Sequence, residues 1–238
     1  MIVCCIDTCR AHIVGSDAHA PLETLVESMD EVCDASRDRI DDSSLSFEDE
    51  AGCVLRGAAA MAALERRSKF SYVETLAFLH ERHLRQRHLL FHPPVPTRDF
   101  APGATPPALV VRPTPPVGLG VFAGEDIAAG AVLAEYAGVV RPRRGETVGC
   151  AHDGFLVEYG ESFGGETLHL SALHYGNVGR FVNHDVDLQN SDLVRCSRDG
   201  LLRVFVVSLR TIPKDAQILV DYGAAYWRES PEIRRRLG

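Results

Sequence analysis

Residues 176–184 read Gly-Asn-Val-Gly-Arg-Phe-Val-Asn-His, and residues 218–223 read Ile-Leu-Val-Asp-Tyr-Gly. Around these two stretches the chain consists of short runs of Val, Leu, Ile and aromatic residues separated by Gly and Asp, a pattern typical of β-strands. We expect strands at residues 109–111, 120–122, 132–136, 155–159, 168–170, 193–195, 202–208 and 218–220. Many short strands with no long helix between them predict a mostly β fold made of small sheets.

The N-terminal part has a different pattern, which predicts three helices. Apolar residues recur at helical spacing over residues 22–33. Residues 47–67 are rich in alanine, a strong helix former. A third helix is expected over residues 71–90, because Ser71 and Glu74 have the spacing of a capping box.

A proline-rich connector separates the two parts. Nine of the 13 prolines lie between Pro93 and Pro116, a density that neither a helix nor a central strand accommodates. The sequence therefore predicts a helical region of unknown role at 1–91, a connector at 92–107, a β domain at 108–229 and a C-terminal tail at 230–238.

Composition and charge narrow the classes of protein and partner. The 238 residues are 45% hydrophobic and 24% charged, as in an ordinary soluble globular protein. No apolar stretch reaches the roughly 18 residues of a bilayer span, and the start lacks the basic region of a signal peptide. We therefore expect an intracellular protein that does not cross a membrane. The net charge of -8 favours a basic partner and argues against direct binding of nucleic acid.

Metal binding is not expected. Cys5, Cys9 and His12 could form half of a zinc site, but their spacing is unusual and no second half is evident. The expected helix at 71–90 carries His80 and His83, where packed or solvated histidines are the commoner reading. With seven cysteines, an odd number, reduced thiols are the simplest interpretation.

The glycines at residues 118–120 have two interpretations. Gly118, Gly120 and Ala123 fit the spacing of a dinucleotide-binding fingerprint. That fingerprint needs a preceding strand and a following helix, whereas here Pro115 and Pro116 precede it and a turn follows. The sequence therefore argues against this fingerprint. The other interpretation is implied by the family resemblance described next: glycines at this place, which lack Cβ atoms, let the backbone approach a ligand closely.

Together, the ordered motifs at 118–120, 176–184 and 218–223 resemble those of SET-domain protein-lysine methyltransferases, over about residues 108–229. The resemblance implies a mostly β SET fold of small sheets with a pseudoknot, the cofactor S-adenosyl-L-methionine, and methyl transfer to a lysine. It implies that Asn183 holds the amino-acid end of the cofactor and that His184 contacts the adenine side through its backbone. The remaining cofactor-binding residues it implies are Gly118, Leu119, Gly120, Phe155, Arg180, Tyr222 and Trp227.

Tyr222 is the predicted catalytic residue. In-line methyl transfer to a neutral amine depends mainly on positioning, and a phenol at the mouth of a narrow channel could hold the amine. Burial and the positive sulfonium would lower the pKa of the lysine, so no strong general base is required. By the same resemblance, Tyr136, Tyr175 and Val220 line the lysine channel, and Val220 leaves the number of transferred methyl groups open.

The motifs depart from the family after His184, where Asp185 and Val186 replace the usual Ser-Cys, and the cysteine-rich modules of many members are missing. A histone tail is the expected substrate, on family resemblance alone, and the nucleus the expected location, with the cytoplasm as the alternative. A non-histone protein substrate stays open. So does a catalytically inactive SET fold that binds peptides or scaffold partners, although the motif residues are retained.

Overall fold

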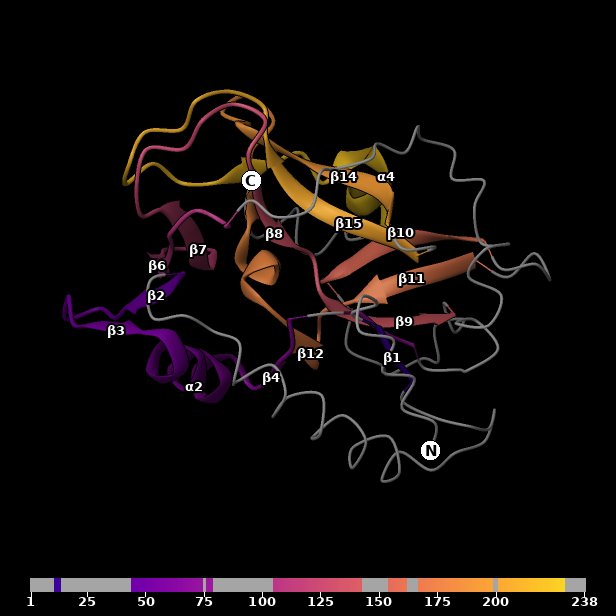
Figure 1. Cartoon of the computed structure of the whole chain (residues 1–238), viewed down its shortest axis with the longest axis horizontal. Coiled ribbons are helices and arrows are strands. Elements are labelled where there is room, and N and C mark those ends of the chain that lie inside the picture. Colours follow the sequence, from indigo (N-terminus) through magenta and orange to yellow (C-terminus); the bar gives the residue numbers. More distant parts are fainter. Residues whose placement is uncertain are drawn as a thin grey trace.

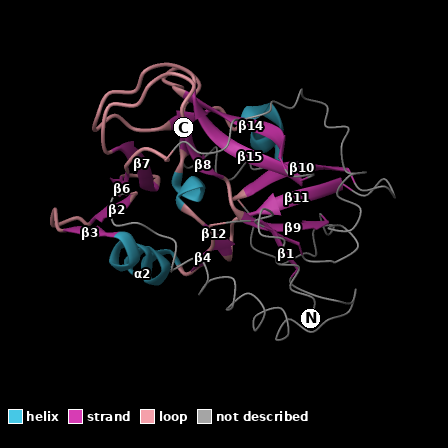
Figure 2. Ribbon diagram, viewed as in Figure 1, coloured by secondary structure: helices cyan, strands magenta, loops and turns pink. Residues whose placement is uncertain are grey.

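The computed structural model describes residues 11–13, 44–74, 76–78, 105–142, 154–161, 167–198 and 201–229. Figure 2 shows that strands dominate these residues and that helices are few. Each of the eight predicted strand segments overlaps a strand of the structure, so the predicted mostly β fold is confirmed. Among these residues, no helix has both the length and the apolar character needed to cross a bilayer.

The first sheet joins the N-terminal part to the β domain. Its strands are β2 (Leu45–Glu48), β3 (Val54–Arg56), β6 (Leu109–Thr114) and β7 (Gly118–Ala123), in the order β3-β2-β6-β7. Strand β2 runs parallel to β6, and β6 runs antiparallel to β7. Helix α2 (Gly57–Ser68) buries Ala60, Met61 and Leu64 in the same apolar core as the inward side chains of this sheet. In Figure 1 the helix lies beside β2 and β3.

Two more sheets form the rest of the body. One has the order β1-β5-β9-β11-β10, with β1 (Ala11–Ile13), β5 (Leu76–Phe78), β9 (Gly138–Pro142), β10 (Leu156–Glu161) and β11 (Thr167–Ser171). The other has the order β14-β15-β8, with β8 (Val132–Glu135), β14 (Ser191–Arg198) and β15 (Leu201–Ser208). In Figure 1, β14 and β15 lie above β9, β10 and β11.

Two short parallel pairs connect distant parts of the sequence. Strand β4 (Ser71–Tyr72) pairs with β12 (Tyr175–Gly176), and β13 (Asn183–His184) pairs with β16 (Leu219–Val220). Between β12 and β13 lies the 3-10 helix η2 (Val178–Phe181), and α4 (Gly223–Glu229) follows β16. The signature stretch at 176–184 thus contains the end of β12, η2 and β13.

The helices of the N-terminal part differ from the prediction. The helix expected from residue 47 begins at Gly57, because residues 49–53 form a turn in which the Asp49 carboxylate accepts the amides of Ala51 and Cys53, at 3.0 and 2.8 Å. This turn returns the chain as an antiparallel hairpin of β2 and β3. The alanine-rich composition therefore predicted the helix but not its start.

The helix expected from Ser71 is wrong over its described residues, which form β4 and β5. The Ser71 amide donates to the carbonyl of His174 at 2.8 Å, and the Val73 amide donates to that of Gly176 at 2.8 Å. Strand β5 runs parallel to β9. Pairing with residues about 60 to about 100 positions away thus overrides the local capping-box pattern.

Several predictions fall on other parts of the chain. The helix at 22–33, most of the connector at 92–107 and the tail at 230–238 lie outside the described residues. So do Cys5, Cys9, His80 and His83 and the side chain of His12. Strands from residues 45–78 share sheets with strands of the predicted β domain, so these two parts of the chain pack together. The predicted domain limits stay predictions.

Candidate active site

The glycine pair at the start of β7 lies against Asn183. The side-chain amide of Asn183 donates to the carbonyl of Leu119 at 3.0 Å. Gly120 is buried, and a Cβ built on it would lie 2.6 Å from both Gln217 Nε2 and Thr114 Oγ1, and 3.0 Å from Asn183 Nδ2. The close approach requires a residue without a side chain at position 120. Gly118, at φ +105, is exposed.

The parallel pairing of β13 and β16 brings the two signature stretches together. Asn183 lies opposite Leu219, and His184 lies opposite Val220. The Asp185 amide extends the ladder by donating to the Val220 carbonyl at 3.2 Å. The pair Asn183–His184 therefore lies beside the segment that leads into Tyr222.

Tyr222 is fixed at both ends by the stretch 182–184. Its phenol donates to the carbonyl of Val182 at 2.6 Å, and its backbone amide donates to Nδ1 of His184 at 3.0 Å. Burial raises the pKa of Tyr222 above its ordinary value, with a smaller contribution from the charge of Tyr226. The phenol therefore stays neutral near pH 7 and has a defined orientation.

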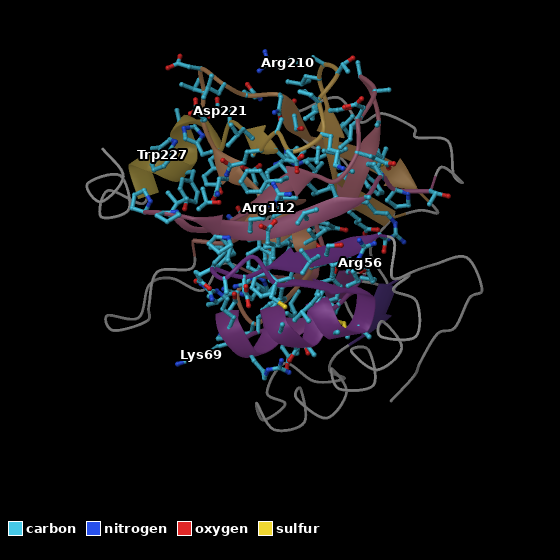
Figure 3. All side chains as sticks on the ribbon, turned by 90° about the vertical axis from the view of Figure 1, so that its left-hand side faces the viewer. Arg56, Lys69, Arg112, Arg210, Asp221 and Trp227 are labelled. Carbon is cyan, nitrogen blue, oxygen red and sulfur yellow. The ribbon has the colours of Figure 1, made fainter. Side chains whose placement is uncertain are left out.

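An aromatic cluster surrounds this tyrosine. The ring of His184 lies 5.3 Å from that of Tyr222 and 4.8 Å from that of Trp227, measured between centroids. Tyr222 also packs edge-on against Tyr226 at 4.7 Å. Both Tyr226 and Trp227 come from α4, so this short helix supplies one wall of the site. Figure 3 shows Trp227 and the neighbouring Asp221 close together on the α4 side.

Arg180 and Phe155 belong to a second cluster. The buried guanidinium of Arg180 donates to the carbonyls of Ala172 and Leu173, at 2.9 and 3.3 Å. It lies 4.2 Å from the ring centroid of Phe70 and 4.3 Å from that of Phe155, in favourable cation-π positions. Arg180 thus joins η2 to the chain at 70, 155 and 172. Direct contact of Arg180 or Phe155 with the cofactor stays a prediction.

The three predicted channel residues lie in three environments. Tyr136 is buried, and its hydroxyl donates to the carbonyl of Phe155 at 3.0 Å. Tyr175, in β12, is half-buried and packs against a small apolar cluster with Ala137. Val220 is 1% exposed and belongs to the main core. Their role in a lysine channel stays a prediction.

The role of Asn177 was not predicted from the sequence. Its Oδ1 accepts the amides of Gly179 at 3.0 Å and Ala137 at 3.4 Å, and its Nδ2 donates to the carbonyl of Glu135 at 2.7 Å. One buried amide therefore fixes η2 to the segment that carries Tyr136. An asparagine ahead of a short helix is a recognisable capping signal.

A buried ion pair was also missed. Arg203 donates to both carboxylate oxygens of Glu135, at 2.8 and 3.0 Å, and the two side chains are 2% and 10% exposed. A single arginine inside the apolar run 202–208 is the signal that could have indicated a buried acidic partner. Glu135 directly precedes Tyr136, so the pair supports the same segment as Asn177. Thr114 and Gln217 crowd Gly120. No sequence pattern indicated that these two residues would lie there.

Comparison with known proteins supports the predicted resemblance. The family model described as SET domain matches residues 118–223. A search of curated proteins found no match. Among solved structures, ATXR5 in complex with histone H3.1 mono-methylated on an arginine is 22% identical, with a TM-score of 0.56, and the match covers 69% of this chain and 86% of that one. The ATXR5 SET domain in complex with di-methylated histone H3 is 23% identical, with a TM-score of 0.56. That match covers 69% of this chain and 85% of the ATXR5 chain.

Proposed function

Because residues 118–223 of this chain are a SET domain, we propose that the protein is a protein-lysine N-methyltransferase that uses S-adenosyl-L-methionine. The observation that carries the proposal is the double anchoring of Tyr222 by Val182 and His184, next to Asn183. A neutral phenol held in one orientation is suited to positioning an amine, which is the main requirement of this reaction.

The residues around β7 and β13 fit the cofactor. Because Gly120 has no side chain, Asn183 can approach the backbone and donate to the Leu119 carbonyl. Asn183 and the backbone of β7 thus form a polar edge that can bind the amino-acid group of the cofactor. Trp227 offers an aromatic face suited to a flat base. When bound, S-adenosyl-L-methionine would supply a methyl group on a positively charged sulfonium that a neutral amine can take up in one displacement.

The hydrogen bonding of Tyr222 limits what this residue does. Its only hydroxyl proton is donated to the Val182 carbonyl, so the phenol oxygen meets an incoming ligand as an acceptor. It can accept an N–H of a lysine amine and turn the nitrogen lone pair toward the methyl donor. Since its pKa is raised, Tyr222 does not act as a base near pH 7. The amine therefore loses its proton to solvent, before the transfer.

We propose a histone tail as the substrate and the nucleus as the site of action. The net charge of -8 favours a lysine-rich partner. The ATXR5 structures, which have the same fold, are complexes with histone H3. A non-histone protein substrate is the alternative in the same chemistry.

A tritium-transfer assay tests this proposal. The protein is incubated with tritiated S-adenosyl-L-methionine and either purified histones or a whole-protein extract, with Tyr222→Phe as the matched control. Label on a histone lysine, lost in the control, supports the proposal. Label only on other proteins overturns the histone assignment, and mass mapping identifies the lysine. No label on either, with no binding of S-adenosylhomocysteine, favours an inactive SET fold that binds peptides or scaffold partners.

A further inference from the structure

The imidazole of His184 carries a hydrogen bond that the cofactor assignment does not use. Its Nδ1 accepts the backbone amide of Tyr222 at 3.0 Å. A ring nitrogen accepts only when it carries no proton, so this contact requires neutral His184 with its proton on Nε2. The side chain is 20% exposed, which leaves it open to protons from solvent.

The same ring is packed by the groups that define the site. It contacts the rings of Tyr222 and Trp227, at 5.3 and 4.8 Å. The phenol of Tyr222 is held separately, by the Val182 carbonyl. Of the two hydrogen bonds that orient Tyr222, the one at its backbone therefore depends on the unprotonated Nδ1 of His184.

We propose that His184 is a positioning residue for Tyr222, acting through its neutral side chain, and that its protonation misplaces the phenol. The inference rests on the proposed function and assigns a task to the imidazole beyond the backbone contact expected of His184. A protonated Nδ1 becomes a donor, so it can no longer receive the Tyr222 amide.

The groups that face His184 determine what happens on protonation. From the segment before α4, the Asp221 carboxylate has Oδ1 3.4 Å from Nδ1. The same oxygen accepts the amide of Gly223, the first residue of α4, at 2.8 Å. Trp227, which packs on the ring from α4, carries no charge. The residues of β16 that pair with β13, Leu219 and Val220, are uncharged as well.

On β13 itself, the carboxylate of the next residue, Asp185, accepts the amides of Asp187 and Leu188, at 3.0 and 2.9 Å. Asp221 is thus the charged group placed to receive a protonated imidazole. Turning toward it would release the Tyr222 amide and disturb the start of α4. Both effects act on the orientation of Tyr222.

Two variants separate the hydrogen bond from the ring. His184→Asn places an amide oxygen close to the position of Nδ1 and does not titrate, whereas His184→Phe keeps a ring but has no acceptor. We expect kcat of His184→Phe to be at least about tenfold below that of the wild type, because one oriented hydrogen bond is lost. The kcat of His184→Asn should be at least about fivefold above that of His184→Phe, because the acceptor returns. The KM for S-adenosyl-L-methionine should differ little between the two.

The pH profile adds a readout that a structural role alone would not move. Between about pH 8 and about pH 6, the ratio of kcat for His184→Asn to kcat for wild type should rise several-fold, because a proton on Nδ1 removes the acceptor in the wild type and not in the variant. Ionisation of the substrate lysine cancels in this ratio. A ratio that stays constant would overturn the proposal, as would His184→Phe with wild-type kcat.

Fluorescence tests the contact without any turnover. Trp227 is the single tryptophan of the chain, and its ring lies 4.8 Å from His184. Protonated imidazoles quench tryptophan, so emission of the ligand-free wild type should fall on acidification, whereas that of His184→Asn should not. Equal quenching in both would contradict the inference. If the wild type quenches as expected but transfers no methyl group, the proposed function fails while the contact stands.

Discussion

Substituting Gly120 with alanine perturbs the site at its tightest point. The added Cβ would lie 2.6 Å from Thr114 Oγ1 and from Gln217 Nε2, about 1 Å closer than a normal contact between heavy atoms. The end of Gln217 can swing away, but Thr114 is branched and stiffer. The added Cβ would also lie 3.0 Å from Asn183 Nδ2, so Asn183 must move by a few tenths of an ångström.

The sizes of two effects follow from these contacts. Overpacking of this kind costs about 1–3 kcal/mol of folding stability. Displacement of Asn183 weakens its hydrogen bond to Leu119 and the contact proposed for it with the charged amino-acid end of the cofactor. A hydrogen bond to a charged group is worth about 1.5–3 kcal/mol. At about 1.4 kcal/mol per factor of ten, the affinity for the cofactor should fall roughly tenfold to a hundredfold.

Calorimetric titration with S-adenosylhomocysteine and urea unfolding measure these effects. Gly130→Ala is the control, because its φ is +79 and a Cβ there meets nothing within 4 Å. It should cost about 1 kcal/mol of stability and leave affinity unchanged. The double variant Thr114→Ala, Gly120→Ala should regain stability but not affinity. A folded Gly120→Ala protein that binds within about twofold of the wild type would refute the reasoning.

Two further predictions concern buried polar groups. Asn177→Ala removes the acceptor of the Gly179 amide and the donor to the Glu135 carbonyl, so unfolding in urea should show a loss of about 2–4 kcal/mol; a loss below about 1 kcal/mol would contradict this role. Tyr159 donates to the Leu202 carbonyl and burial raises its pKa. The contribution of Tyr159 to folding stability is therefore fully present below the pKa of about 10 that a tyrosine has in the unfolded chain. Above that pH the contribution is lost, by up to about 1.4 kcal/mol per pH unit. Between pH 9 and 11 the free energy of unfolding should therefore fall less steeply with pH in Tyr159→Phe than in the wild type. An equal slope in the two proteins would contradict this role of Tyr159.

The strands could be predicted because their signal is local. Each of the segments at 109–111, 168–170 and 202–208 carries a short β-type run between turn residues, and burial on the pleated surface follows from it. The contacts that assemble the site have no such signal. The pairing of Ser71 with His174, and the approach of Gln217 to Gly120, join residues about a hundred positions apart.

The family motifs predicted a set of site residues, and the structure shows how three of them are arranged. Asn183, His184 and Tyr222 were expected near one another, and β13 and β16 bring them together. The motif did not indicate that His184 would bind the amide of Tyr222 through its side chain, because side-chain direction depends on the register of a two-residue strand pair. Arg180, expected at the cofactor, contacts Phe70 and Phe155, and its contact with the cofactor stays a prediction.

The most direct test of the account compares kcat with cofactor affinity in Tyr222→Phe. The substitution removes the hydroxyl bonded to Val182 and keeps the ring between His184 and Tyr226. We predict that kcat for methyl transfer falls at least about tenfold while Kd for S-adenosylhomocysteine stays within about threefold, because the proposed role of the phenol is at the amine. An equal loss of affinity and turnover, or an unchanged kcat in a protein that still folds, would contradict the central role given to this phenol.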